Sequence, residues 1–257
     1  MHYSSEQHEE IDEGMDDLSR VIHSRWVSLA SDVAPLLKQE LAREHILHGA
    51  ARRLRIIEQC LKNIFEIYPV RRTQLLGDEE RSDLELNLHS FLIHIHGVPD
   101  NLAWVFLIER KIPLKPFQIG LFREETQEHL PADVVKYLTS EPISSWHWNY
   151  AKDYRDALAH RIPPYVPPAT YTPAHEEEIR ELEKRREQAI EDSDSELALQ
   201  LEAAKYEVGI ICPAFMHSFS DEDAIGPIVL HPQMIADART VIEIIGVVVP
   251  YLSLPKD

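Results

Sequence analysis

The chain has 257 residues, of which 44% are apolar and 27% are charged, a composition typical of a globular protein with one large core or two small ones. Its net charge of -18 argues against a general nucleic-acid-binding protein. Apolar runs are short or interrupted, so the sequence predicts no membrane span of about 20 residues, and the acidic start is unlike a signal peptide. We therefore expect a cytoplasmic protein with no membrane partner. Only Cys60 and Cys212 are present, which predicts neither a disulfide framework nor a thiolate zinc site.

The negative charge is concentrated in two segments. Residues 1–20 carry a net charge of -6 and residues 174–207 carry -7, whereas residues 38–72 carry +4. A local basic face is therefore expected on an acidic protein.

Three helices are predicted in the first part of the chain. Residues 18–34 form the weakest pattern, while residues 35–68 repeat apolar side chains every three or four positions, as a long amphipathic helix does. A second such row over residues 84–110 passes through Gly97 and Pro99, which predicts one kinked helix or two abutting ones.

Two further helices are predicted before a proline-rich stretch. Residues 130–139 indicate a short helix. Residues 144–162 indicate a longer one, capped by Ser144 or Ser145 and stopped by the prolines at 163 and 164.

The next segment departs from this pattern. Five prolines within residues 163–173 favour an extended linker, and residues 174–206 read as a charged helical region that is split at residues 192–194. Ser193 and Glu196 have the spacing of a capping box for its second helix.

A small hairpin and a buried helix are expected at the end. Residues 208–219 and 225–230 are rich in β-branched and aromatic side chains around a Ser-Asp-Glu-Asp turn, and Pro213 favours an edge position for the first strand. Residues 233–252 are apolar almost all round, as in a buried helix.

The sequence thus predicts a mainly α protein that forms a single helical domain over residues 1–257. Its core is expected to be an antiparallel four-helix bundle, with a proline linker, charged helices and a β-hairpin inserted within it. The predicted core helices are residues 35–68, 84–110, 144–162 and 233–252, and the insertion is residues 163–231.

One helix end gathers chemically versatile side chains. Arg155, Asp156 and His160 lie within residues 154–165, which end in two prolines and a tyrosine. The Arg-x4-His spacing, with a polar residue after the arginine, resembles the motif of the HEPN superfamily. That resemblance implies a helical bundle and a homodimer, and for many members a metal-independent endoribonuclease in toxin–antitoxin systems, anti-phage defence or stress response. Other members have lost catalysis and act as binding modules.

The resemblance implies that Arg155, His160 and Asp156 are catalytic. In RNA cleavage the ribose 2′-hydroxyl attacks the neighbouring phosphorus and the 5′-oxygen leaves, so a histidine suits proton transfer and an arginine suits the charge that develops on the phosphoryl oxygens. No metal or other cofactor is expected. Lys152, Tyr154 and Arg161 are the predicted substrate-binding residues.

Helix geometry qualifies this assignment. Positions five apart differ by about 140°, so Arg155 and His160 do not share a face, and a distorted last turn or a second subunit must bring them together. Asp156 and His160 are four apart and do share a face, which predicts a hydrogen bond that orients the imidazole and raises its pKa.

A structural role is the alternative for these residues. Asp156 then pairs with Lys152 or His160 on a solvated face, and Arg155 pairs with a carboxylate on a neighbouring helix. On this interpretation the protein is an inactive HEPN-like module that binds a nucleotide or, through residues 174–231, a protein partner.

Fourteen histidines invite a metal hypothesis, but His94 and His96 are two apart and point to different sides of a helix. The sequence therefore favours no metal site, with His89 and His96 partly buried and bonded to protein groups.

Two further readings remain open. Trp146 and Trp148 either stack bases near the motif or belong to the core, where we expect at least one of them. Asp100 and Asn101 either cap a helix that resumes after a kink or lie beside the motif across the bundle.

Overall fold

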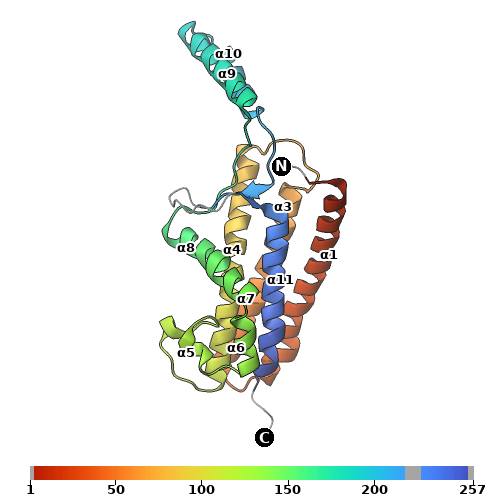
Figure 1. The fold of residues 1–257 in the computed structure, drawn as a ribbon, viewed down its shortest axis with the longest axis vertical. Coiled ribbons are helices and arrows are strands. Elements are labelled where there is room, and N and C mark those ends of the chain that lie inside the picture. The colour runs from red at the N-terminus through yellow and green to blue at the C-terminus, as the bar shows by residue number, and fades with distance from the viewer. Residues whose placement is uncertain (1–2, 218–226, 254–257) are drawn as a thin grey trace.

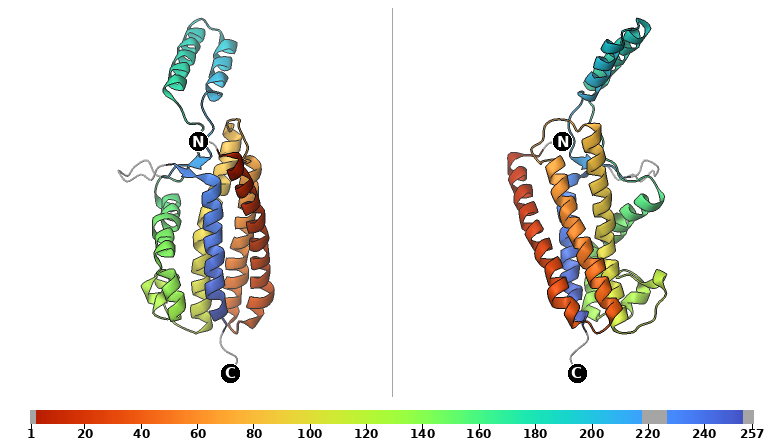
Figure 2. Two further views of the ribbon diagram at one scale, coloured as in Figure 1. Left: turned by 45° about the vertical axis from the view of Figure 1, so that its right-hand side comes forward. Right: turned by 180° about the vertical axis from the view of Figure 1, so that it is seen from behind.

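The computed structural model describes residues 3–217 and 227–253, and these residues are mostly helical (Figure 1). The long helices run up and down the molecule beside one another (Figures 1 and 2). The main helices are α1 (Ser5–Ser28), α2 (Glu40–Glu44), α3 (Arg52–Ile67), α4 (Asp78–Glu109), α6 (Ala132–Leu138), α7 (Glu141–Trp146), α8 (Lys152–His160), α9 (Pro173–Glu191), α10 (Ser195–Tyr206) and α11 (Leu230–Val248).

Helices α1, α3, α4 and α11 lie side by side and share the apolar core (Figure 2). Each of them contributes fully buried side chains, such as Ile22, Leu61, Phe91 and Ile244. Helices α7 and α8 lie on the other side of α4 and α11 from α1 and α3, where Trp146 is buried. The mainly α class is confirmed. Residues 144–162 contribute Trp146, Ala151 and Tyr154 to the core, and α1, which was predicted only as a weak helix over residues 18–34, joins it as well.

Helix α1 begins well before the predicted residue 18. Ser4 accepts a hydrogen bond from the backbone of Gln7, and the Gln7 side chain accepts one from the backbone of Ser4, which forms a capping box. Ile11 and Met15 are buried on one face of the acidic segment. The acidic residues of the first 20 therefore form the solvated face of a core helix.

The predicted helix 35–68 begins later and contains an irregular turn. Pro35 lies in a 3-10 turn, η2 (Ala34–Leu36), and the helical run starts at α2. A π-helical segment, η3 (His45–Ala51), joins α2 to α3, which ends before Pro69 as predicted. Pi segments inside α-helices often occur at functional sites.

Helix α4 is one continuous helix of 32 residues that contains Pro99. Of the described helices it alone is long and apolar enough to cross a membrane, and 67% of its most apolar stretch is buried inside the protein. Burial of that extent is what a core helix shows, so α4 gives little support for a membrane span.

Helices α7 and α8 are continuous through a further π segment, η5 (His147–Ala151). The run starts at Glu141, after its N-cap residue Ser140. The prediction that Ser144 or Ser145 caps this helix is therefore wrong. It ends at His160, close to the predicted proline stop.

The segment after α8 is extended and partly paired. Tyr165 bridges Met216 and Thr170 bridges Ile210, so the predicted linker runs antiparallel to the chain returning from α10. The predicted hairpin is short: β1 (Ala214–Phe215) pairs with β2 (Ile228–Val229). The predicted Ser-Asp-Glu-Asp turn lies outside the described residues.

Helices α9 and α10 form a hairpin that projects beyond one end of the bundle (Figures 1 and 2). The chain turns at the predicted place, with Ser193 at a φ of 62°. Asp194 caps α10 by accepting a hydrogen bond from the backbone of Leu197, so the predicted capping box of Ser193 and Glu196 does not form. Ion pairs from Arg186 to Glu202 and from Lys205 to Glu183 join the two helices.

Candidate functional site

A pocket of 370 Å³ lies beside the Arg-x4-His motif and is called here the Arg155 pocket. It is enclosed by α4, by the α7–η5–α8 run and by the loop that contains η4 (Pro116–Gln118). Its volume lies within the range of roughly 300–1,000 Å³ that is common for small-molecule sites. The polar side chains that line it are His96, Asp100, Arg123, His147, Lys152 and Arg155.

The cations of α8 are held by a carboxylate of the same helix. Lys152 donates to Asp156 Oδ2 at 2.7 Å, and Arg155 donates to Asp156 Oδ1 at 2.6 Å. Partial burial opposes ionisation of Asp156, but the hydrogen bond from Lys152 and the charge of Arg155 outweigh it, so its pKa lies below the usual value. Asp156 is therefore a carboxylate that positions the two cations at the pocket wall.

Helix α4 supplies a histidine and an aspartate one turn apart. His96 Nδ1 lies 3.5 Å from Asp100 Oδ2, and Asp100 Oδ1 would be only 3.1 Å from a Cβ atom at Gly120. Desolvation in the pocket raises the pKa of Asp100 to about 6, against the opposing charges of Arg155, Arg53 and Arg123. A carboxyl group with such a pKa exchanges protons close to neutral pH.

A second imidazole reaches the pocket from the π segment η5. His147 stacks on Phe122 with ring centroids 3.8 Å apart, and its ring centroid lies 5.6 Å from that of His96. Burial lowers the pKa of His96 to about 4 and that of His147 to about 3, with the nearby positive charges adding to the effect. Both imidazoles are neutral at pH 7, so each offers one donor and one acceptor and no charge.

The pocket can therefore do two things chemically. Arg155, Lys152 and Arg123 supply three positive charges, which suit the oxygens of a phosphate group. Asp100 has a pKa that permits it to accept a proton from a ligand hydroxyl when it is ionised.

The chain alone does not bring the predicted catalytic pair together. Helix α8 is regular from Lys152 to His160, so the predicted divergence of Arg155 and His160 is preserved. Arg155 lines the pocket, whereas His160 is exposed at the helix end. In the described part of the chain the Asp156 carboxylate contacts Lys152 and Arg155, with no hydrogen bond to His160, so the orienting bond predicted between them does not form.

The predicted substrate-binding residues separate into three positions. Lys152 lines the Arg155 pocket. Tyr154, which was predicted to bind substrate, is 1% exposed and packs edge-on against Phe215. Its ring therefore does not face the pocket. Arg161 lies past the end of α8 and forms an ion pair with Asp153, away from the pocket lining.

The two tryptophans have different places. Trp146 is buried and donates to Asp237 of α11 at 2.9 Å, which confirms the expectation that at least one belongs to the core. Trp148 is 45% exposed and lines the pocket, with the ammonium of Lys152 5.8 Å from its ring centre. Trp148 is therefore an aromatic surface available to a ligand.

The histidines of α4 also behave differently from one another. His94 contacts Arg53 of α3 and His96 faces His147, so these two point to different sides of α4, as predicted. His89 donates to the carbonyl of Pro164 at 2.6 Å, which confirms its expected bond to a protein group. Within residues 3–217 and 227–253 no three His, Cys, Asp or Glu side chains are grouped so as to hold a metal ion.

Sequence reasoning missed part of this pocket. The structure favours the reading that places Asp100 beside the motif, and its four-residue spacing from His96 was a visible signal for a shared helix face. Arg123 and His147 carried no such signal, because a loop and a π segment position them.

Comparison with known proteins gave no relative: no family model, curated protein or solved structure matches this chain. Any assignment of function therefore depends on the pocket itself.

Proposed function

We propose that the protein is a metal-independent endoribonuclease of the HEPN type that works as a homodimer, with RNA bound at the Arg155 pocket. The observation that supports it is the meeting of Arg155, Lys152 and Arg123 with Asp100 in one pocket. This combination holds a phosphate and offers a proton acceptor at the same place.

The chemistry assigns a role to each group. Arg155 and Lys152 bind the non-bridging oxygens of the scissile phosphate and neutralise the charge that develops on them. Ionised Asp100 accepts the proton of the ribose 2′-hydroxyl, whose oxygen attacks the phosphorus. The bond from phosphorus to the 5′-oxygen then breaks, which leaves a 2′,3′-cyclic phosphate and a 5′-hydroxyl. Trp148 provides a face on which a base stacks.

The leaving 5′-oxygen needs a proton, and this is the role proposed for His160. Because His160 is exposed and diverges from Arg155 on α8, it serves the pocket of a second copy of the chain. Two exposed helix ends related by two-fold symmetry reach each other's pockets in such a dimer.

The experiment is cleavage of a single-stranded RNA in excess chelator. Arg155→Ala and His160→Ala should each reduce the rate by at least about 100-fold. The matched control is Arg185→Ala, which removes an exposed arginine from α9. RNA with a 2′-deoxy sugar at the cleavage position should resist, since it lacks the nucleophile. Cleavage that requires a divalent metal, or that survives both substitutions, would contradict the proposal.

Mixing the two inactive variants tests the shared site. A dimer of one Arg155→Ala and one His160→Ala chain has one complete site, so a random mixture should recover about a quarter of the wild-type activity. No recovery, with dimers present by light scattering, would mean that His160 does not act at the pocket of the other chain.

A second candidate function is an inactive HEPN-like module that binds a protein partner. The observation that favours it is the exposure of large apolar side chains on the α9–α10 hairpin, with Leu199 72% and Tyr206 58% exposed. The ion pair of Lys152 with Asp156, one of the structural pairings predicted, also fits a pocket that binds without reacting. A protein that cleaves no RNA but binds a protein partner through the α9–α10 hairpin would support this candidate.

A further inference from the structure

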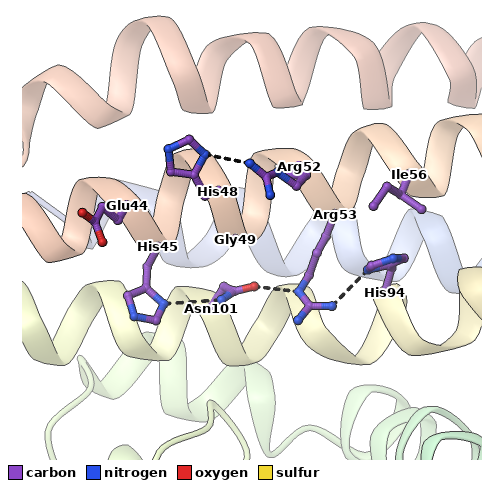
Figure 3. A pocket seen from close by; sticks show the side chains of 9 residues that line it. All are labelled: Glu44, His45, His48, Gly49, Arg52, Arg53, Ile56, His94 and Asn101. Carbon is purple, nitrogen blue, oxygen red and sulfur yellow. Dashed lines mark hydrogen bonds between the residues drawn. The ribbon is translucent and has the colours of Figure 1, made fainter.

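A second pocket, of 420 Å³, lies on the other side of α4, between that helix and the η3–α3 run (Figure 3). It is called here the Arg53 pocket. The motif and the proposed cleavage reaction make no use of it. Its polar lining consists of two arginines and several neutral side chains, with one exposed carboxylate, Glu44, at its edge.

Arg53 is fixed in this pocket by neutral partners. Its Nε donates to Asn101 Oδ1 at 2.8 Å and its Nη1 donates to His94 Nδ1 at 3.0 Å, both on α4. Figure 3 shows the guanidinium lying between these two side chains. Two of its five N–H groups are used in this way, and the others are available to a ligand.

Two glycines make the close approach possible. A Cβ atom at Gly97 would lie 2.5 Å from Arg53 Cζ, and one at Gly49 would lie 2.6 Å from Asn101 Nδ2. Any other residue at Gly97 would push the guanidinium away from α4. The geometry of Arg53 therefore depends on a cradle that a single methyl group would fill.

The charge of Arg53 is not neutralised by a direct ion pair. Among the described residues no carboxylate lies within salt-bridge distance of Arg53 or Arg52, and burial lowers the pKa of Arg53. Asp100, the acid whose charge Arg53 feels most, lines the pocket on the opposite face of α4. A partly buried cation without a contacting anion is costly unless a ligand supplies one.

Two histidines of the pocket accept hydrogen bonds from its arginines. His94 Nδ1 accepts from Arg53, and His48 Nδ1 accepts from Arg52 Nη2 at 3.0 Å. An arginine only donates, so each imidazole accepts through Nδ1, and in its neutral form the ring proton sits on Nε2. Each neutral ring therefore carries an N–H donor, and together with the two guanidinium groups these donors suit an oxyanion.

We propose that the Arg53 pocket binds the phosphate group of a nucleotide or of an RNA strand, with Arg53 as the principal ligand-binding residue and Arg52, His48 and His94 as further donors. Both sources present the same chemistry, a phosphate oxyanion on a sugar. The pocket volume leaves room for the sugar as well as the phosphate.

The first test is a titration of the intact protein with inorganic phosphate, followed by NMR of the histidine rings. Phosphate should move the His94 and His48 ring signals, with an affinity that Arg53→Gln weakens at least about tenfold. Arg55→Gln is the matched control, because Arg55 is on the same helix but lies over Trp26, outside the pocket. Equal affinity in the wild-type and Arg53→Gln proteins would overturn the proposal, as would ring signals that phosphate does not move.

Two further variants keep the test decisive if Arg53→Gln fails to fold. Arg52 is exposed at the edge of the pocket, so Arg52→Gln should fold and weaken phosphate binding by a smaller factor. Glu44→Gln removes the one carboxylate of the lining and should strengthen it. No change in either variant would also overturn the proposal.

The last arm separates the two sources of phosphate and the two pockets. If adenosine monophosphate binds as phosphate does, and a single-stranded RNA binds equally well to wild type and Arg53→Gln, then the ligand is a free nucleotide. Loss of RNA affinity in Arg53→Gln identifies the RNA strand. Arg155→Gln should leave phosphate binding at the Arg53 pocket unchanged, so a failure of the proposed ribonuclease does not remove this site.

Discussion

The Arg155 and Arg53 pockets lie on opposite faces of α4 and are built alike, but they differ in their acids. Each has an arginine on its wall and each adjoins a π segment, η5 in the first and η3 in the second. The Arg155 pocket contains Asp100 within its lining, whereas the hydrogen bonds of Arg53 within the described residues go to the neutral His94 and Asn101. The first pocket is therefore suited to moving a proton and the second to holding an anion.

The largest effect should come from removing the acid that distinguishes the Arg155 pocket. With Asp100→Asn we expect RNA cleavage to fall about 100-fold, because the proton acceptor is lost, while phosphate binding at the Arg53 pocket remains. The wild-type rate should rise with pH through about 6, where Asp100 ionises, and the variant should lack this rise. The pH–rate profiles of wild type and Asp100→Asn measure this difference.

Asp83→Asn is the control for this change, since Asp83 is exposed on the same helix. If the cleavage rate of Asp100→Asn still rises with pH through about 6, Asp100 is not the proton acceptor, and the proposed chemical difference between the pockets is wrong.

The next effect concerns the cradle of the Arg53 pocket. Gly97→Ala places a methyl group where the Arg53 guanidinium lies, so we expect the free energy of unfolding to fall by up to about 3 kcal/mol and phosphate binding to be lost. Gly246→Ala is the matched control: a Cβ there meets nothing within 4 Å, and removing a helical glycine should stabilise by about 0.5–1 kcal/mol. Chemical denaturation measures the stability of both variants, and the phosphate titration measures their binding.

If Gly97→Ala keeps both its stability and its phosphate affinity, then Arg53 does not need the close approach to α4 and the cradle has no role in binding.

A smaller effect separates the pockets by their response to acid. The folded-state pKa of His147 lies far below its unfolded value, so its contribution to stability is present above the unfolded pKa and is lost as pH falls toward about 3. His147→Phe keeps a ring on Phe122 without a proton to gain. Below pH 6.5 we expect the free energy of unfolding of His147→Phe to fall less steeply with decreasing pH than that of wild type, by about 1 kcal/mol per pH unit.

Denaturation at a series of pH values measures this slope, and His129→Gln, at an exposed histidine, is the control. An unchanged slope in His147→Phe would mean that His147 is protonated as easily in the folded protein as in the unfolded chain.

The last effect concerns the support of the Arg155 pocket by α11. Asp237 is 2% exposed and accepts hydrogen bonds from Trp146 and Gln233, and burial raises its pKa to about 7. A raised folded-state pKa gives stability that is present below the unfolded pKa and is lost as pH rises through the folded value. Asp237→Asn should therefore gain stability over wild type at pH 8, by up to about 1.4 kcal/mol for each unit by which burial raises the pKa of Asp237, and should gain little at pH 4. Equal differences at the two pH values would contradict the raised pKa.

Local patterns predicted most of the helices. The apolar rows of α3, α4 and α11, the break before Pro69 and the turn after α9 are visible in the chain, because helix periodicity and prolines act over a few residues. The role of the acidic segment in α1 could not be predicted from the sequence. Its apolar residues are sparse, and they are buried only because α1 packs against α3 and α11.

The candidate site was predictable only in part. Arg155, Lys152 and the Lys152–Asp156 pairing follow from spacing on one helix. The burial of Tyr154 and the direction of Asp156 away from His160 depend on neighbouring side chains that the sequence does not place.

The sequence by itself determined that the protein is mainly helical, that Arg155 and His160 diverge on a regular helix, and that the charge is uneven along the chain. The tertiary structure decided that Arg123, Asp100 and His147 meet Arg155, and that Gly97 admits Arg53 to the opposite face of α4. The reason is that helix formation depends on neighbours a few positions away, whereas a pocket and its pKa values depend on groups that come together only when distant helices pack.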